Sequence, residues 1–332
     1  MIATAIQSLD EFEMEENMDT TVVKIENLVK RYKEVIALDH MNLEINEGEI
    51  FGLLGPNGSG KTTTLNCLLS LLTYDKGSIT VFGKSMTPVS YQSKRQIGVV
   101  MQNVAVLNEL TVYENVDYFC GLYVTDKDER KRLVQEAIEF VGIEDFVKFY
   151  PKKLSGGLLR RLNIACGIAH KPKLIIFDEP TVAVDPQSRN KILEGILQLN
   201  REGSTIIYTS HYMEEVEQIC TRIAIMDHGK KVAEGTKEQL KKMIKNTETV
   251  VIEIEAIPAE VKEKLTTLPH VYEVNYDKGH LEVKCSGGKH NLIRILNVLQ
   301  ESELNFGRVY SELPTLNDVF LEITGKALRD EN

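Results

Sequence analysis

One segment of eight residues limits what this chain can fold into more than any other. It reads Gly-Pro-Asn-Gly-Ser-Gly-Lys-Thr over residues 55–62, after the apolar stretch Glu49–Leu54 and before a helical pattern. A glycine-rich loop between a buried strand and a helix turns its backbone N–H groups inward, where they can surround phosphate oxygens. The segment therefore predicts an α/β fold of the P-loop nucleotide-binding kind, with a phosphate site at the end of a strand.

Each residue type in this loop has a physical use. The three glycines let the backbone approach phosphate, and the helix that begins near Lys61 points its positive end at the same charge. The Lys61 ammonium would reach the β- and γ-phosphates, and the Thr62 hydroxyl would ligate Mg²⁺. The predicted contacts of the nucleotide are Gly55, Pro56, Asn57, Gly58, Ser59, Gly60, Lys61, Thr62 and Thr63.

A second strand ends in two acidic residues. The apolar run Leu174–Phe177 is followed directly by Asp178 and Glu179. Acids after strands are also common as helix caps, so the pair alone would be a weak signal. Beside a P-loop the pair has a clear use, because ligands bind at the carboxyl edge of parallel sheets. We expect Asp178 in the Mg²⁺ shell and Glu179 as the base that activates the attacking water.

The pattern along the chain divides it into parts. Residues 1–20 are acidic and without a long period, which predicts a disordered extension. Residues 21–246 alternate apolar strands with helical patterns, and about 103–170 is mostly helical, which indicates a helical subdomain inserted into a nucleotide-binding domain. The expected strands of its core are Glu49–Leu54, Ile97–Met101, Leu174–Phe177, Thr205–Thr209 and Arg222–Met226, and the expected helices include Asp128–Val141 and Lys237–Asn246.

The pattern restarts over residues 247–332, where we expect a C-terminal accessory domain. Its β-α-β-β-α-β order predicts a small ferredoxin-like α+β fold. The apolar face of this segment must be buried within its own small fold, against the nucleotide-binding domain or against a second copy. The last helix, Thr315–Thr324, is the best candidate for a docking element, and a helix that merely closes the small domain is the alternative. The segments of the small fold are Thr249–Ile254, Ala259–Thr266, Val271–Tyr276, His280–Cys285, Asn291–Glu301 and Asn305–Tyr310.

Composition excludes several classes of protein. The formal net charge of -10 argues against a general nucleic-acid binder, so no nucleic-acid partner is expected. No stretch approaches the ~20 apolar residues of a membrane helix, so a role at a membrane would depend on partner chains. The five cysteines are scattered and show no CxxC spacing, which predicts reduced thiols in the cytoplasm.

A third motif, Leu-Ser-Gly-Gly over residues 154–157, lies between the P-loop and the acidic strand. This order of motifs resembles the ATP-binding-cassette (ABC) ATPases over roughly Val22 to Glu234. In that family the signature of one subunit caps the γ-phosphate held by the P-loop of the other. The resemblance implies that Ser155, Gly156 and Gly157 act in trans, in a dimer that closes around two molecules of ATP with Mg²⁺.

The resemblance also assigns four single residues. It implies that Gln102 contacts Mg²⁺ and the attacking water, and that His211 is a switch residue at the γ-phosphate. Asp185 would belong to the loop that crosses the dimer interface. Tyr32 would stack on adenine, although an ordinary strand tyrosine is the alternative.

Within the family, the closest resemblance is to ATPases of drug and antibiotic exporters. It is carried by the P-loop, by Arg160-Arg161, by the sequence from Asp185 to Arg189, and by the tail from Leu313 to Gly325. It implies a homodimer, or a pair with a related ATPase, bound to a separate polytopic permease on the inner face of the cell membrane. A soluble ABC ATPase that is not coupled to transport, and a module without turnover, remain alternatives. Leu158 and Leu159 depart from the polar residues that many relatives carry there.

Overall fold

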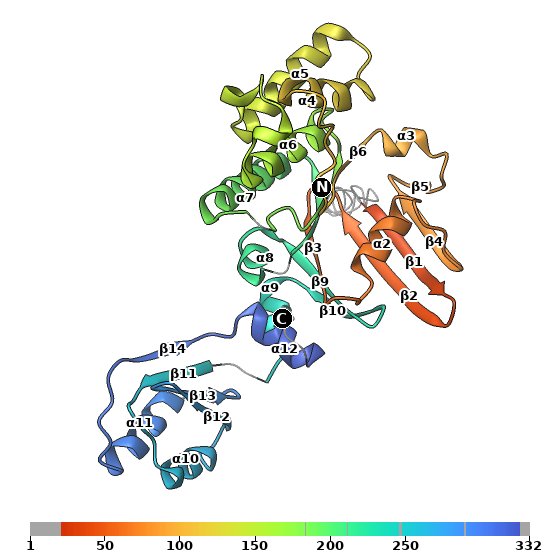
Figure 1. Ribbon diagram of the computed structural model, residues 1–332. Coiled ribbons are helices and arrows are strands. Elements are labelled where there is room, and N and C mark those ends of the chain that lie inside the picture. The colour runs from red at the N-terminus through yellow and green to blue at the C-terminus, as the bar shows by residue number, and fades with distance from the viewer. Residues whose placement is uncertain (1–20, 183, 211, 246–247, 289, 326–332) are drawn as a thin grey trace, which may run out of the picture.

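The structure is a computed structural model that describes residues 21–182, 184–210, 212–245, 248–288 and 290–325. It confirms the predicted fold class, a P-loop α/β cassette with a helical subdomain, followed by a small α+β unit (Figure 1). The predicted disordered extension, residues 1–20, lies outside the described residues. Within the described ranges, no helix is both long enough and apolar enough to cross a bilayer.

The central sheet has six strands in the order β10-β9-β3-β8-β7-β6. Its strands pair in parallel except β10, which pairs antiparallel with β9 at one edge. Every residue of β3, β7 and β8 is buried, as expected where helices or a second sheet cover both faces. The bounds are β3 Ile50–Leu54, β6 Ile97–Val100, β7 Leu174–Asp178, β8 Thr205–Thr209, β9 Arg222–Asp227 and β10 Lys230–Gly235.

This strand order decides where the site can form. Because β8 lies between β3 and β7, the segment that follows β8 leaves the sheet between the P-loop and the acid pair. All three segments follow the carboxyl ends of parallel strands and so meet at one edge of the sheet. Of the five predicted strands of this sheet, Thr205–Thr209 matches the observed one and the other four differ by one residue at one end, whereas β10 was not predicted.

A second, antiparallel sheet packs on the first. The sequence pattern did not predict this sheet as a separate layer. Its order is β2-β1-β4-β5. Helix α2 (Lys61–Leu68), which follows the P-loop, shares a core with both sheets, and that core includes Ile25, Phe51, Leu65 and Ile176. The bounds of the sheet are β1 Thr21–Tyr32, β2 Val35–Asn46, β4 Lys76–Val81 and β5 Lys84–Ser85.

Three longer helices form the helical subdomain around a core of their own (Figure 1). The Asp126 side chain caps the start of α5, and Gly142 ends it with a left-handed backbone at φ 65°. The observed α5 begins one residue before the predicted Asp128–Val141. The helices are α4 Val112–Gly121, α5 Lys127–Val141 and α6 Gly156–Ile168, with the short α3 Tyr91–Lys94 preceding them and the short η1 Glu144–Phe146 and η2 Pro151–Lys153 between α5 and α6.

Three more helices cover the central sheet: α7 Pro186–Arg201, α8 Met213–Ile219 and α9 Lys237–Lys241. The prediction of a helix over Lys237–Asn246 was too long. Helix α9 ends at Lys241, and the chain then turns so that Ile244 is buried in the main core. Burial of the Ile244 side chain in the core is favourable, and it favours this turn over a longer helix exposed to solvent.

The small unit has the predicted β-α-β-β-α-β order in an antiparallel sheet, β12-β13-β11-β14, with its own core. The last strand was predicted over Asn305–Tyr310 but spans Val309–Glu312, because its pairing with β11 runs from Ile252 back to Thr249. The five cysteines of the chain are buried thiols. The other bounds are β11 Glu248–Glu253, α10 Ala259–Thr266, β12 Val271–Asp277, β13 His280–Cys285 and α11 Asn291–Glu301.

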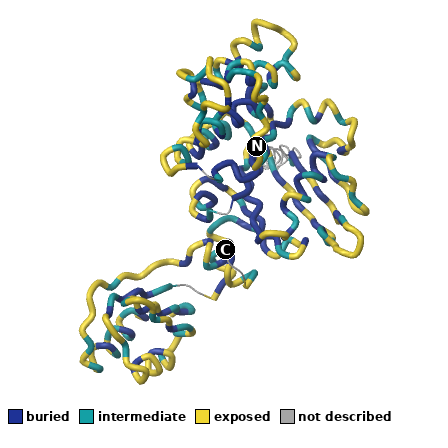
Figure 2. Tube along the Cα trace, in the orientation of Figure 1, coloured by how far each residue is buried: buried dark blue, intermediate teal, exposed yellow. Residues whose placement is uncertain are grey.

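The last helix, α12 (Leu316–Thr324), leaves the small unit and packs on the cassette. It contacts α8 and α9, and the backbone N–H of Lys245 donates to Glu322 Oε1 at 2.9 Å. Leu316, Val319 and Phe320 are buried in the main core. The trace of the small unit, by contrast, is exposed over much of its length (Figure 2).

Candidate functional site

The P-loop forms a tight cradle that only glycine permits at two positions. A Cβ atom on Gly55 would lie 2.3 Å from Ser59 Oγ and 2.5 Å from the carbonyl oxygen of Met226. At Gly60, φ is 106°, and a Cβ atom would lie 2.8 Å from the carbonyl oxygen of Ala37. The loop can therefore keep this shape only with the glycines that the sequence places there.

The polar groups of the cradle fit an anionic ligand. Lys61 is buried, and its Nζ donates to the carbonyl oxygens of Gly55 at 2.6 Å and Pro56 at 3.2 Å. Burial holds the pKa of Lys61 below its ordinary value, an effect that the charges of Glu179 and Asp178 partly offset. The buried Ser59 Oγ has no hydrogen-bond partner among the described residues. A buried cation beside an unsatisfied hydroxyl and a helix N-terminus is suited to phosphate.

The acid pair lies at the end of β7 and is held by the neighbouring strand. Both carboxylates are buried. Thr209 Oγ1 donates to Asp178 Oδ1 at 2.7 Å and accepts the backbone N–H of Glu179 at 3.0 Å. Glu179 adopts a left-handed backbone with φ 51°, an uncommon state that is found mostly where the surroundings enforce it. Sequence reasoning missed Thr209, whose signal was a polar residue at the end of an apolar strand.

Gln102, which follows β6, contacts Glu179. Its Nε2 donates to Glu179 Oε2 at 2.8 Å. The backbone before it is tied to the signature helix, because the Arg160 guanidinium donates to the carbonyl oxygen of Met101 at 3.0 Å. Asn163 adds a second tie by accepting the backbone N–H of Ala105 at 3.0 Å. The Gln102 segment thus links the helical subdomain to the site.

The signature begins helix α6, and the predicted dimer loop lies beside it. Ser155 is the N-cap residue and accepts the backbone N–H of Leu158 at 3.3 Å. A Cβ atom on Gly157 would lie 3.2 Å from Asp185 Oδ2, so the two motifs are in contact. Asp185 caps α7 by accepting the backbone N–H of Ser188 at 2.9 Å, and this bond lowers the pKa of the carboxyl.

The two leucines that depart from the family pattern have partial burial, and Leu158 packs against the core of the helical subdomain. An apolar side chain at position 158 thus adds packing within the helical subdomain, where a polar side chain could instead extend toward a ligand.

The roles of the predicted site residues stay predictions, and for two of them the structure adds little. Tyr32, at the end of β1, is 45% exposed, with Lys30 Nζ 5.1 Å from its ring centroid. That exposure suits a stacking surface and equally an ordinary strand tyrosine. His211 lies outside the described residues, although Ser210 and Tyr212 on either side of it are described.

Comparison with known proteins decides the family. The chain is 37% identical over 312 residues to the linearmycin resistance ATP-binding protein LnrL of Bacillus subtilis, a similarity that covers 93% of this chain and all of that protein. The chain belongs to the ABC transporter ATP-binding proteins. A family model described as ABC transporter matches residues 38–182, and one described as the C-terminal domain of DrrA1-3-like ATP-binding proteins matches residues 235–324.

Other relatives agree with this assignment. The ABC ATPase is 31% identical to the daunorubicin resistance ATP-binding protein DrrA3 of Streptomyces coeruleorubidus, over 93% of this chain and 97% of that one. Among solved structures, it resembles a dimeric ATP-binding cassette in a post-hydrolysis state bound to ADP and phosphate. That match has a TM-score of 0.60 and 29% identity, and covers 64% of this chain and 98% of the other. The chain is therefore an ATPase of the cassette type that binds and hydrolyses ATP.

Proposed function

We propose that this ABC ATPase powers the export of a hydrophobic antibiotic or similar compound through a separate polytopic permease, on the cytoplasmic face of the cell membrane. The observation that carries the proposal is the similarity to a linearmycin resistance protein, which spans both the cassette and the C-terminal unit. Relatives named for daunorubicin resistance and for Nod factor export match over a similar share of the chain.

Hydrolysis would take place between two copies of the chain. The P-loop of one copy would hold the phosphates through Lys61, and Ser155 to Gly157 of the other copy would cap them. Thr62, Gln102 and Asp178 supply the oxygen ligands that Mg²⁺ prefers, so these residues fit the ion, which would offset phosphate charge when bound. Asp185 would join the two copies through the loop beside each signature.

Glu179 would accept the proton of the attacking water. Its Oε2 accepts from Gln102, and its backbone is held by Thr209, so the carboxylate has a defined position before any substrate arrives. Such positioning is the main contribution of a protein to phosphoryl transfer. His211 would complete the site on the γ-phosphate side.

The catalytic part of the proposal is tested by Glu179→Gln. Loss of the general base should lower ATP turnover about 10²–10⁴-fold while ATP binding remains. The variant should then accumulate a closed dimer with ATP, seen by gel filtration. Glu194→Gln, a change of the same kind at an exposed position of α7, is the control and should hydrolyse ATP normally. Near-normal turnover by Glu179→Gln would refute the role.

The transport part is tested in cells. The tagged chain should co-purify from detergent-solubilised membranes with a polytopic protein. Cells without the chain should become sensitive to at least one hydrophobic antibiotic, and the wild-type chain should restore resistance where Glu179→Gln does not. A ribosome or DNA partner, with unchanged sensitivity across the panel, would support the alternative of a soluble ATPase not coupled to transport.

A further inference from the structure

A buried carboxylate outside the described catalytic set connects two loops of the site. Glu215 lies in the first turn of α8, and only 2% of its surface is exposed. Carboxylates are almost never fully buried unless they are paired and hydrogen-bonded. Its partners therefore indicate what this carboxylate holds in place.

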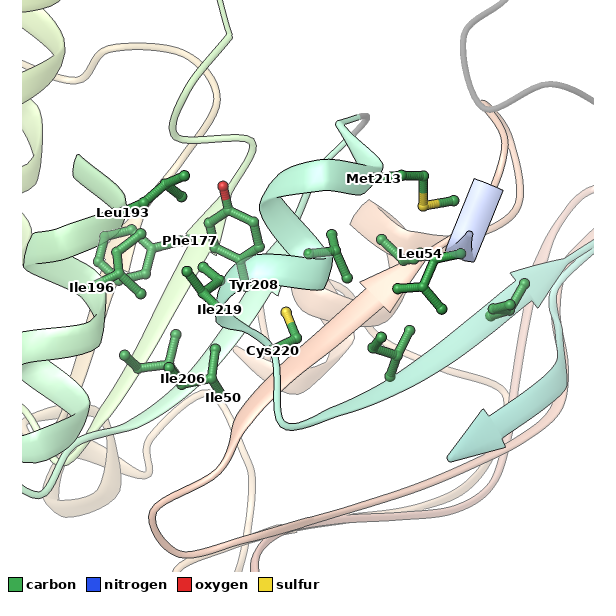
Figure 3. Packing of buried hydrophobic residues seen from close by; sticks show 14 of the residues in the cluster. Ile50, Leu54, Phe177, Leu193, Ile196, Ile206, Tyr208, Met213, Ile219 and Cys220 are labelled. Carbon is green, nitrogen blue, oxygen red and sulfur yellow. The ribbon is translucent and has the colours of Figure 1, made fainter. Parts of the chain in front are cut away.

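Three hydroxyl groups, one from the loop after β7 and two from the end of β8, donate to one oxygen atom, Glu215 Oε2. Thr181 Oγ1 donates at 2.9 Å, the Tyr208 hydroxyl at 2.7 Å and Ser210 Oγ at 2.6 Å. All three donors are buried. Figure 3 shows the ring of Tyr208 among the core residues, with its hydroxyl directed away from Ile206 and Ile50. Burial, together with the charge of Glu215, raises the pKa of Tyr208, so the phenol keeps its proton as a donor.

Two of these donors, Thr181 and Ser210, come from the loops that follow β7 and β8 at the γ-phosphate side of the proposed site, and Tyr208 lies in β8 itself. Thr181 stands between the base Glu179 and the dimer-loop residue Asp185 in the sequence. Ser210 precedes His211, and its Oγ also accepts the backbone N–H of Tyr212 at 3.0 Å. The backbone on both sides of position 211 is therefore tied to the same carboxylate as the loop after Glu179.

A cation from a third element completes the network. Arg189, in α7, places Nε 3.3 Å from Glu215 Oε1, and its guanidinium carbon lies 4.0 Å from the ring centroid of Tyr212. Neither Arg189 Nε nor Glu215 Oε1 has a hydrogen-bond partner among the described residues, so the contact between them is an ion pair without a hydrogen bond. Arg189 thus joins α7, which begins after Asp185, to Glu215 by charge and to the segment after His211 by stacking.

We propose that Glu215 is a positioning residue for ATP hydrolysis, which holds Thr181, after Glu179, and Ser210 and Tyr212, on either side of position 211, in one arrangement beside the γ-phosphate. The inference rests on the proposed roles of Glu179 and His211. It predicts that loss of Glu215 slows the chemical step and leaves the affinity for ATP nearly unchanged, because Lys61 and the P-loop belong to a different set of contacts.

The test compares Glu215→Gln with Glu214→Gln, a matched change at the exposed neighbouring position of the same helical turn. Small misplacements of reacting groups can cost about 10²-fold in rate. We expect the kcat of Glu215→Gln to fall about 10- to 100-fold while the KM and equilibrium affinity for ATP stay within about twofold. Glu214→Gln should behave as wild type.

A second variant keeps the proposal testable if Glu215→Gln folds poorly. Arg189 is partly exposed, so Arg189→Met should fold and should lower kcat by a smaller factor. Where both variants fold, the double variant should be no slower than Glu215→Gln, because both changes act on one network. Unchanged kcat in Arg189→Met and Glu215→Gln, or a parallel loss of ATP affinity and kcat, would overturn the positioning role. Wild-type hydrolysis would still stand in either case, so the proposed function would survive.

Discussion

Lys61 is the only charged side chain of the P-loop, and this isolation makes its contribution measurable. Hydrogen bonds to a charged group are worth about 1.5–3 kcal/mol, so Lys61→Ala should weaken ATP binding roughly 10- to 100-fold. Lys61→Met keeps most of the side chain's volume and should lose as much affinity for ATP, because both changes remove the charge. The measurement is equilibrium titration with ATP, with Lys127→Met as an exposed control. Unchanged affinity in both Lys61 variants would contradict the phosphate role.

Tyr32 offers a test in which two alternatives give different results. If its ring stacks on adenine, Tyr32→Ala should weaken ATP binding by about 1–3 kcal/mol, whereas Tyr32→Phe should change it little. Tyr91→Ala, at another exposed tyrosine, is the control. Equal damage from Ala and Phe would indicate a role for the hydroxyl, and no damage from either would leave an ordinary strand tyrosine.

At the residue scale, the sequence predicted the groups whose chemistry is unusual for their position. Lys61, Asp178 and Glu179 stood out because a charge in a glycine-rich loop or at the end of an apolar strand needs a reason. Thr209, Asn163 and Glu215 did not stand out, because hydroxyl, amide and acidic groups in those positions are common. Only the fold shows that Thr209 lies between the acid pair and the P-loop, and that Glu215 is buried.

At the scale of elements, strands buried on both faces were the easiest to predict. β7 and β8 are built around short apolar runs, and the sequence predicted their bounds to within one residue. The end of α9 and the position of β14 were less predictable because each depends on a distant partner. Ile244 turns into the main core, and β14 pairs with β11, some 60 residues earlier in the chain. Contacts of that range leave no local pattern.

Helix α6 carries the prediction that belongs to this scale, since its first turn is the proposed cap on the partner's γ-phosphate. Ser155→Arg should leave ATP binding to the monomer intact but block dimer closure. The change also removes an N-cap bond worth about 1 kcal/mol, so a second variant is needed. Ser155→Asp keeps a capping side chain and places a negative charge where phosphate would lie. Both should stay monomeric with ATP in a Glu179→Gln background by gel filtration. A dimer peak that persists in both would refute action in trans.

At the scale of the whole molecule, the order of parts along the chain differs from their packing. The sequence places α12 at the end of the C-terminal unit, yet its apolar face belongs to the main core of the cassette. The sequence left three surfaces open for the C-terminal segment: its own small fold, the nucleotide-binding domain and a second copy. The structure shows α12 packed on the nucleotide-binding domain. The amphipathic spacing of the helix indicates that one face must be buried, but it carries no information on which surface covers that face.

This packing predicts that α12 stabilises the cassette. Phe320 is fully buried there, so Phe320→Ala in the full chain should destabilise the cassette by about 3–5 kcal/mol. Ile295→Ala, at a buried site in the small unit, should affect that unit alone because it belongs to a separate core. Hydrogen exchange at the amides of β7 and β8 distinguishes the two: it should accelerate with Phe320→Ala and stay unchanged with Ile295→Ala. Equal exchange in both variants would mean that α12 does not support the cassette.

A chain that ends at Asn246 extends this test from stability to function. It lacks α12, which shares the main core with Leu240 and Ile244, so these two side chains should lose packing. The P-loop contacts lie elsewhere, and we expect ATP binding to remain. Helix α12 contacts α8, which follows Ser210 and Tyr212, so its loss should loosen these neighbours of the proposed switch residue and weaken dimer closure. Gel filtration with ATP in a Glu179→Gln background should then show little dimer, and export should fall. If the shortened chain dimerises and supports export as well as the full chain does, α12 contributes packing alone.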